Sequence, residues 1–216
     1  MVSKRKCLSG CNLYLILDAG VCSYDRLFEV LKAATLSGVD IVQLRDKVGF
    51  VKETLRFSKK SIAWLKGRIP FIVNDRVDIA RISGACGVHL GQDDIPLAEA
   101  RRLLGARAII GVSCQNLTHV RRALRDGADY VGFGSVYRTL TKPGRSPMDQ
   151  GELKKAVQFS EREGLPFFAI GGITRGNLGQ VKDNDVRRVA VCRDILLAGD
   201  IRRSVGEFCA ALNVKQ

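Results

Sequence analysis

The feature that most constrains this chain is an eightfold alternation of two kinds of segment. Short apolar runs recur along its 216 residues. They are near-continuous, rich in β-branched or aromatic residues and bounded by Gly, Pro, Asn or Asp, which is typical of strands buried on both faces of a parallel sheet. The predicted strands are Leu13–Leu17, Val39–Leu44, Phe71–Val73, Gly87–Leu90, Ala108–Val112, Asp129–Phe133, Pro166–Ile170 and Arg187–Val191.

Segments with helical periodicity lie between these runs. In Tyr24–Leu36, for example, Leu27, Val30, Leu31 and Ala34 recur on one stripe. The other predicted helices are Lys52–Arg68, Asp75–Ile82, Leu97–Leu104, Asn116–Arg125, Gly151–Arg162, Asn177–Lys182 and Ile201–Leu212. Strand followed by helix, eight times, predicts a (β/α)8 TIM barrel. We expect one domain over residues 1–216 with a short N-terminal extension, residues 1–12; an open doubly wound sheet is the alternative fold.

The surplus of basic over acidic residues indicates which classes of molecule the protein could bind. Lys and Arg number 35 against 22 Asp and Glu, a formal net charge of +13. Such a surplus suits nucleic acid, an acidic membrane or small anions such as phosphates. No run approaches the ~18 apolar residues of a membrane helix, and no basic helix, zinc finger or aromatic stacking platform is evident. We therefore expect small anionic substrates rather than nucleic acid or a membrane, and the sequence leaves a homo-oligomer open.

The cysteine pattern indicates a compartment. The chain has seven cysteines, an odd number, and no CxxC pair. The spacings suit neither a zinc site nor a disulfide framework. Reduced, mostly buried thiols are typical of a cytoplasmic protein, and we expect that location.

A barrel places its active site at the carboxyl ends of its strands, and the second predicted strand ends in cations. Gln43, Arg45 and Lys47 alternate along an extended segment, so we expect them to share one face. Arg forks onto phosphate oxygens and Lys acts as a point charge. The triplet predicts an anion site at the barrel mouth, although an ordinary solvated strand exit would look similar.

Carboxylates follow the next two predicted strands. Asn74 and Asp75 stand at the end of the third strand, and Asp94 follows the fourth. Mg²⁺ takes one or two carboxylates together with substrate phosphate oxygens. Each of these residues could instead cap the helix that follows it, and His89 is expected to be a buried core residue. Without a nucleophile–base pair, chemistry built on cations, Mg²⁺ and backbone amides favours departure of an anionic leaving group.

The remaining strand ends carry hydroxyls and glycines. Ser113 ends the fifth strand, and the loop after the sixth, residues 139–144, is expected to be a mobile lid. Gly171-Gly172 follows the seventh strand, where backbone N–H groups approach an anion closely. We expect a second phosphate there.

Six motifs, in order along the chain, resemble the thiamine-phosphate synthase family. They are Gln43–Lys47, Asn74–Arg76, Gly87–Asp94, Gly111–Ser113, Thr139–Lys142 and Ala169–Ile173. The resemblance runs from about Tyr14 to Leu196. It implies a barrel transferase that condenses hydroxymethylpyrimidine diphosphate with hydroxyethylthiazole phosphate, requires Mg²⁺, and releases thiamine phosphate and pyrophosphate.

The resemblance also implies roles for individual residues. Contacts to the pyrimidine diphosphate fall on Gln43, Leu44, Arg45, Asp46, Lys47, Asn74, Ser113 and Lys142. The Mg²⁺ ligands fall on Asp75 and Asp94. The thiazole phosphate and the rest of the substrate pocket fall on Thr139, Leu140, Thr141, Gly172, Cys192 and Arg193. The catalytic groups would be Arg45, Lys47, Ser113 and Lys142.

The chain departs from the family at its eighth strand. The family commonly has Gly-Ala-Asp before this strand and a small hydroxyl residue at its exit. Here Asn184–Arg188 precedes the strand and Arg193 stands at the exit, which leaves the thiazole-phosphate contacts open. The alternative function is that of the related thiazole tautomerases, which isomerise a thiazole carboxylate phosphate without condensation. The full Gln-x-Arg-x-Lys set, the Asp pair and Lys142 favour the synthase.

Overall fold

Eight parallel strands close into a barrel. The computed structural model describes residues 8, 10–140 and 146–213. Each strand pairs with the next, and β1 pairs with β8 to complete the ring. The strands are β1 (Leu13–Asp18), β2 (Ile41–Arg45), β3 (Phe71–Asn74), β4 (Gly87–Leu90), β5 (Ile109–Cys114), β6 (Tyr130–Phe133), β7 (Phe167–Ile170) and β8 (Val189–Val191). The predicted (β/α)8 barrel is confirmed, and the open doubly wound sheet is excluded.

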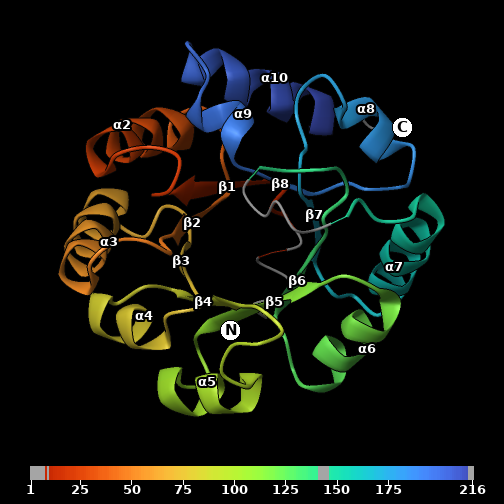
Figure 1. The fold of residues 1–216 in the computed structure, drawn as a ribbon, viewed down its shortest axis with the longest axis horizontal. Helices are drawn as coiled ribbons and strands as arrows, with labels where there is room; N and C mark the ends of the chain where they lie inside the picture. Colours follow the sequence, from red (N-terminus) through yellow and green to blue (C-terminus); the bar gives the residue numbers. More distant parts are fainter. Residues whose placement is uncertain (1–7, 9, 141–145, 214–216) are drawn as a thin grey trace.

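The helices surround the strands as an outer ring (Figure 1). They are α2 (Tyr24–Thr35), α3 (Val51–Leu65), α4 (Val77–Ser83), α5 (Leu97–Leu104), α6 (Leu117–Arg125), α7 (Gln150–Arg162), α8 (Leu178–Lys182), α9 (Arg193–Leu196) and α10 (Ile201–Asn213). The sequence did not predict α9, because four residues are too few to show a helical period. Within the described ranges, no helix combines the length and apolar character that a membrane crossing requires.

Side-chain caps fix where several helices begin. The Asp149 carboxylate accepts a hydrogen bond of 2.9 Å from the Glu152 amide at the start of α7. Asn116 accepts one of 2.8 Å from the His119 amide at the start of α6. Each cap satisfies an amide that has no partner within its helix. These local signals set the spacing between strands and therefore the loops that form the barrel mouth.

The strands divide their side chains between two cores. In β1, Leu13, Leu15 and Leu17 pack outward in the larger cluster against the helices, whereas Tyr14 and Ile16 belong to the smaller cluster inside the barrel. This is the two-residue period of an extended strand. The same alternation in β2 turns Gln43 and Arg45 toward the interior, as the sequence predicted.

The barrel interior is filled at its amino end. Leu8 and Cys11, which precede β1, pack in the same cluster as the inward-facing residues. They therefore close the lower end of the barrel. The other part of the predicted N-terminal extension, residues 1–7 and 9, lies outside the described residues.

One glycine makes room for the largest interior ring. A Cβ atom at Gly111 in β5 would lie 2.1 Å from Cζ of Tyr130. Any other residue at this position would displace the Tyr130 ring, which is fully buried.

Candidate active site

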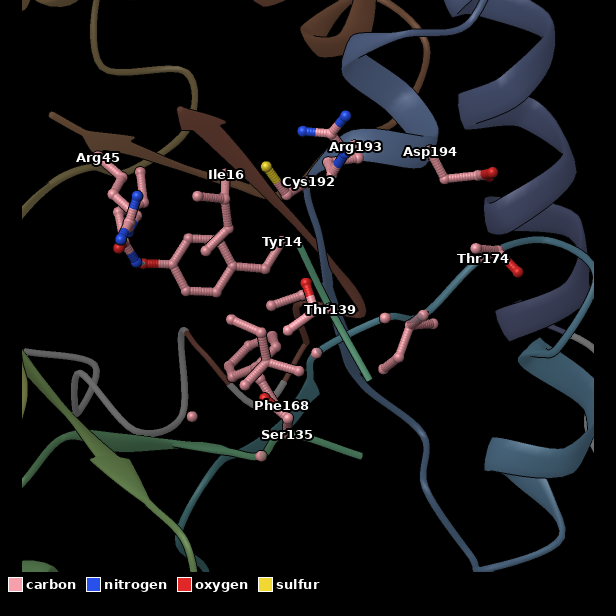
Figure 2. Close-up of a pocket in the computed structure, with 18 of the residues that line it drawn as sticks. Tyr14, Ile16, Arg45, Ser135, Thr139, Phe168, Thr174, Cys192, Arg193 and Asp194 are labelled. Carbon is pink, nitrogen blue, oxygen red and sulfur yellow. Dashed lines mark hydrogen bonds between the residues drawn. The ribbon is translucent and has the colours of Figure 1, made fainter. Parts of the chain in front are cut away.

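A cavity of about 500 Å³ opens at the carboxyl ends of the strands. Its floor holds the rings of Tyr14 and Phe168, whose centroids lie 5.4 Å apart at an interplanar angle of 79°. Figure 2 shows these rings between Arg45 on one side and Thr174 on the other. The predicted site residues that line the cavity are Gln43, Arg45, Asn74, Ser113, Thr139, Leu140, Gly172, Cys192 and Arg193.

A buried carboxylate holds Arg45 in place. Asp18 ends β1 directly opposite Arg45 in β2. Its Oδ2 accepts a hydrogen bond of 2.7 Å from Arg45 Nη1, and its Oδ1 accepts one of 2.9 Å from the Gly20 amide. The Arg45 Nε is buried and makes no hydrogen bond within the described part of the chain. The Arg45 side chain as a whole lines the cavity. Asp18 was not among the residues predicted from the sequence, although its place at a strand end was a usable signal.

A cation and two carboxylates meet beside the cavity. Lys47 Nζ contacts Asp75 Oδ2, and the Asp75 carboxyl is in hydrogen-bond contact with Asp94. Asp94 Oδ2 also accepts a hydrogen bond of 2.6 Å from the Gly91 amide. Burial raises the pKa of Asp75, the nearby Asp94 raises it further, and Lys47 opposes them only in part. Two carboxyl groups held this close attract a cation.

The carboxylates of Asp75 and Asp94 fit Mg²⁺ if water and substrate oxygens supply its other ligands. Among the described residues, no group of three or more His, Cys, Asp or Glu side chains could hold a metal ion. Asp75 and Asp94 would therefore supply two ligands, leaving the other positions to water and substrate oxygens. Mg²⁺ prefers this arrangement, because it dehydrates reluctantly and commonly binds through one or two carboxylates plus phosphate.

A chain of hydrogen bonds crosses the cavity floor. Gln43 Nε2 donates to the Tyr14 hydroxyl at 2.7 Å, and that oxygen lies 2.8 Å from the Tyr130 hydroxyl. The Tyr130 hydroxyl lies 3.0 Å from His89 Nδ1, and His89 Nε2 lies 3.0 Å from Ser113 Oγ. Burial raises the pKa of both tyrosines, so each hydroxyl keeps its proton. His89 is buried, as expected, but it is part of the floor rather than of an apolar core.

Two residues of the β2 motif turn away from the cavity. Leu44 packs in the outer core. The Asp46 carboxylate contacts the Tyr24 hydroxyl, accepts a bond of 2.7 Å from Thr54 Oγ1, and accepts another of 2.7 Å from the Gly49 amide. Burial alone would raise the pKa of Asp46, but these hydrogen bonds outweigh it and the pKa is lowered. Asp46 thus fastens the loop that carries Lys47.

Two further predicted residues belong to the predicted lid. Thr141 and Lys142 lie outside the described residues. The described end of that segment includes Thr139 and Leu140, and Leu140 exposes 75% of its surface beside the cavity.

The far side of the cavity carries more positive charge. Arg138, Arg175 and Arg193 all line it. Arg175 pairs with Asp194 at 2.8 Å and with Glu207 at 2.9 Å. Arg138 and Arg193 form no ion pair with any described residue, which suits a second anion. Arg138 was not among the residues predicted from the sequence.

A close contact between two loops shapes this side. Gly172 has φ 64°, and a Cβ there would lie 2.5 Å from the carbonyl oxygen of Arg138. Only glycine allows the loop after β7 to approach the loop after β6 this closely. The exposed backbone then lies at the position where barrels commonly bind phosphate.

Comparisons with known proteins agree along nearly the whole chain. Residues 13–195 match the family described as thiamine monophosphate synthase (TMP-TENI). The chain is 40% identical to a thiamine-phosphate synthase of Gloeobacter violaceus, over 97% of this chain and 60% of that protein. It is also 40% identical to a thiamine-phosphate synthase of Shouchella clausii, over 85% of this chain and 88% of that protein.

A solved structure gives the same result. The thiamine phosphate pyrophosphorylase from Pyrococcus furiosus superposes with a TM-score of 0.83 at 30% identity, over 96% of each chain. The present chain spans about three-fifths of the length of the Gloeobacter relative, so the match covers the barrel and not all of that protein. On sequence and on structure alike, this chain belongs to the thiamine monophosphate synthase family.

Proposed function

We propose that this protein joins hydroxymethylpyrimidine diphosphate to hydroxyethylthiazole phosphate, forming thiamine phosphate and releasing pyrophosphate. The observation that carries the proposal is one cavity with two cationic sides and an aromatic floor between them. Arg45 stands on one side, and Arg138 and Arg193 stand on the other. A pair of phosphorylated ring compounds fits such a cavity with their rings together and their anionic groups apart.

The first chemical step is loss of diphosphate from the pyrimidine. The bond between the methylene carbon and the diphosphate oxygen breaks, and its electron pair leaves with that oxygen. Arg45, Lys47 and Asn74 would bind the departing group, and Asp18 keeps the Arg45 guanidinium in position. Mg²⁺, held by Asp75 and Asp94, would supply further positive charge to the diphosphate oxygens. The electron-rich aminopyrimidine shares the positive charge left on the methylene carbon.

The second step is attack by the thiazole nitrogen. Its lone pair forms the new carbon–nitrogen bond at the methylene carbon. The backbone at Gly172 and the Arg193 side chain would hold the thiazole phosphate, and the exit at Cys192 would complete that pocket. Tyr14 and Phe168 form a floor that keeps water from the reactive carbon.

The loop after β6 and the location of the protein complete the proposal. Thr139, Leu140, Thr141 and Lys142 would cover the substrates, with Lys142 adding charge at the diphosphate. A cytoplasmic location fits the free thiols of Cys22, Cys86, Cys114 and Cys209.

The direct test mixes the purified chain with both substrates and Mg²⁺ and measures thiamine phosphate and pyrophosphate. We expect equal amounts of the two products, and no product when either substrate is omitted or when a chelator removes the metal. Arg45→Ala should lower turnover by about a hundredfold, whereas Arg102→Ala, which changes an exposed arginine on α5, should not. If neither product forms, condensation is contradicted, and isomerisation of the thiazole carboxylate phosphate becomes the better explanation.

A further inference from the structure

The hydrogen-bond chain across the cavity floor has a direction. Five side chains from five different strands contribute: Gln43, Tyr14, Tyr130, His89 and Ser113. At its first link Gln43 Nε2 donates to the Tyr14 oxygen, because an amide nitrogen has no lone pair to offer. Buried polar groups are hydrogen-bonded as a rule, so each hydroxyl along the chain must direct its own hydrogen to the next acceptor.

That rule fixes the next two links. The two tyrosine oxygens lie 2.8 Å apart, and either could be the donor by distance alone. Since the Tyr14 hydroxyl accepts from Gln43, the rule assigns its hydrogen to the Tyr130 oxygen. Tyr130 is fully buried, and by the same rule its hydrogen is assigned to His89 Nδ1, 3.0 Å away. The ring nitrogen Nδ1 of His89 must then be the unprotonated one.

The tautomer of His89 determines whether the Ser113 hydroxyl is free to donate a hydrogen bond into the cavity. With Nδ1 accepting, a neutral His89 carries its hydrogen on Nε2 and donates it to Ser113 Oγ, 3.0 Å away. The Ser113 hydroxyl hydrogen is then left over, and Ser113 lines the cavity. At the opposite end Gln43 Oε1 makes no hydrogen bond within the described part of the chain, and Gln43 lines the cavity too.

We propose that Tyr14, Tyr130 and His89 are positioning residues that make Gln43 an acceptor and Ser113 a donor, so that the floor selects a ring bearing an amino group and an unprotonated ring nitrogen. This inference rests on the proposed function and specifies how its pyrimidine substrate is recognised. The amino N–H would donate to Gln43 Oε1, and the ring nitrogen would accept from Ser113. The corresponding oxo-pyrimidine presents a carbonyl in place of the amino group and is rejected, because a buried acceptor would then face an acceptor.

The direction of the chain can be measured without substrate. The sequence contains two histidines, His89 and His119. Nitrogen-15 long-range correlation spectra of the wild type and of His119→Gln at neutral pH assign the His89 signals and show which ring nitrogen is protonated. We expect the hydrogen on Nε2. A hydrogen on Nδ1, or on both nitrogens, overturns the proposal.

The consequence for recognition is tested with Tyr130→Phe, which removes the central link. We compare kcat/KM for the amino-pyrimidine diphosphate and its oxo analogue in wild type and variant. The wild type should prefer the amino form by at least about a hundredfold, and Tyr130→Phe should reduce that preference by about tenfold. Loss of a merely structural contact would lower both values together and leave their ratio unchanged, which would contradict the proposal.

Controls separate this effect from general damage. Tyr137→Phe removes a tyrosine hydroxyl that donates to Gln180 at 3.2 Å outside the cavity, and it should leave the ratio unchanged. If Tyr130→Phe does not fold, Tyr14→Phe breaks the same chain one link earlier and should give the same change. Inactivity of the wild type toward both pyrimidines would contradict the proposed function. The histidine spectra would still show the direction of the hydrogen bonds across the cavity floor.

Discussion

At the scale of single residues, the chain keeps charged groups in places that oppose folding. Asp75 is held against Asp94, and both burial and that neighbour raise the pKa of Asp75. A raised pKa in a carboxyl group means that the folded protein disfavours the charged form. The pair is therefore unfavourable in the metal-free protein, as expected for a site that is completed by a cation.

Asp75→Asn should separate stability from activity. The neutral amide relieves the contact with Asp94, so the melting temperature of the metal-free protein should rise at neutral pH. Because a candidate ligand is lost, the Mg²⁺ concentration needed for half-maximal turnover should increase by at least about tenfold, and turnover should fall. Thermal melts and Mg²⁺ titrations of activity measure the two effects.

The matched control is Asp78→Asn, three residues further along the chain. Asp78 is exposed and pairs with the exposed Arg76, so its removal should change neither quantity appreciably. Unchanged Mg²⁺ dependence in Asp75→Asn would remove the metal assignment.

At the scale of elements, strand alternation decides which residues reach the cavity. The two-residue period turns Tyr14, Gln43 and Arg45 inward. Glycine positions in the strands then decide how much room each inward ring has. Gly111 in β5 lies under the Tyr130 ring, so the cavity floor depends on a residue that has no side chain of its own.

Gly111→Ala should therefore destabilise the barrel and disturb its floor. The added methyl group cannot coexist with Tyr130 in its present place, and overpacking of this kind costs about 1–3 kcal/mol. Urea unfolding should show a lower midpoint. Gly179→Ala in α8 is the control: a Cβ there meets nothing within 4 Å, and alanine in a helix should stabilise by roughly 0.5–1 kcal/mol. Equal midpoints for Gly111→Ala and wild type would show that the floor can rearrange.

At the scale of the whole molecule, the excess of positive charge surrounds a site for anions. The formal net charge is +13, and the cavity has arginines on both of its sides. A field of this sign raises the encounter rate of phosphorylated substrates, and salt screens it over about 10 Å at 0.1 M ionic strength.

We expect kcat/KM for both substrates to fall several-fold as ionic strength rises from about 0.05 to 0.5 M. The value of kcat at saturation should change much less, because the bound substrates are shielded from bulk salt. Steady-state kinetics across a salt series provide the measurement. A kcat/KM that is independent of salt would mean that the basic surface serves another purpose.

Local sequence patterns were enough to predict the barrel and most of the residues at its mouth. The apolar runs and helical periods are local patterns, and the strand ends follow from them, so the places of Arg45, Asn74 and Ser113 at strand ends were enough to assign them to one opening. Local chain geometry also explains the limits of that reasoning. Leu44 and Asp46 belong to the same motif as Arg45, yet one packs in the outer core and the other fastens a loop.

The contacts between side chains became known from the folded barrel alone. The pairing of Asp18 with Arg45 depends on the register of two strands, and the link from Tyr14 to Tyr130 joins residues 116 positions apart. Such contacts depend on how the closed barrel sets opposite walls against each other, and no local pattern in the chain encodes that distance. The direction that we propose for the hydrogen bonds across the floor, and with it the proposed recognition of an amino ring, depends on barrel closure.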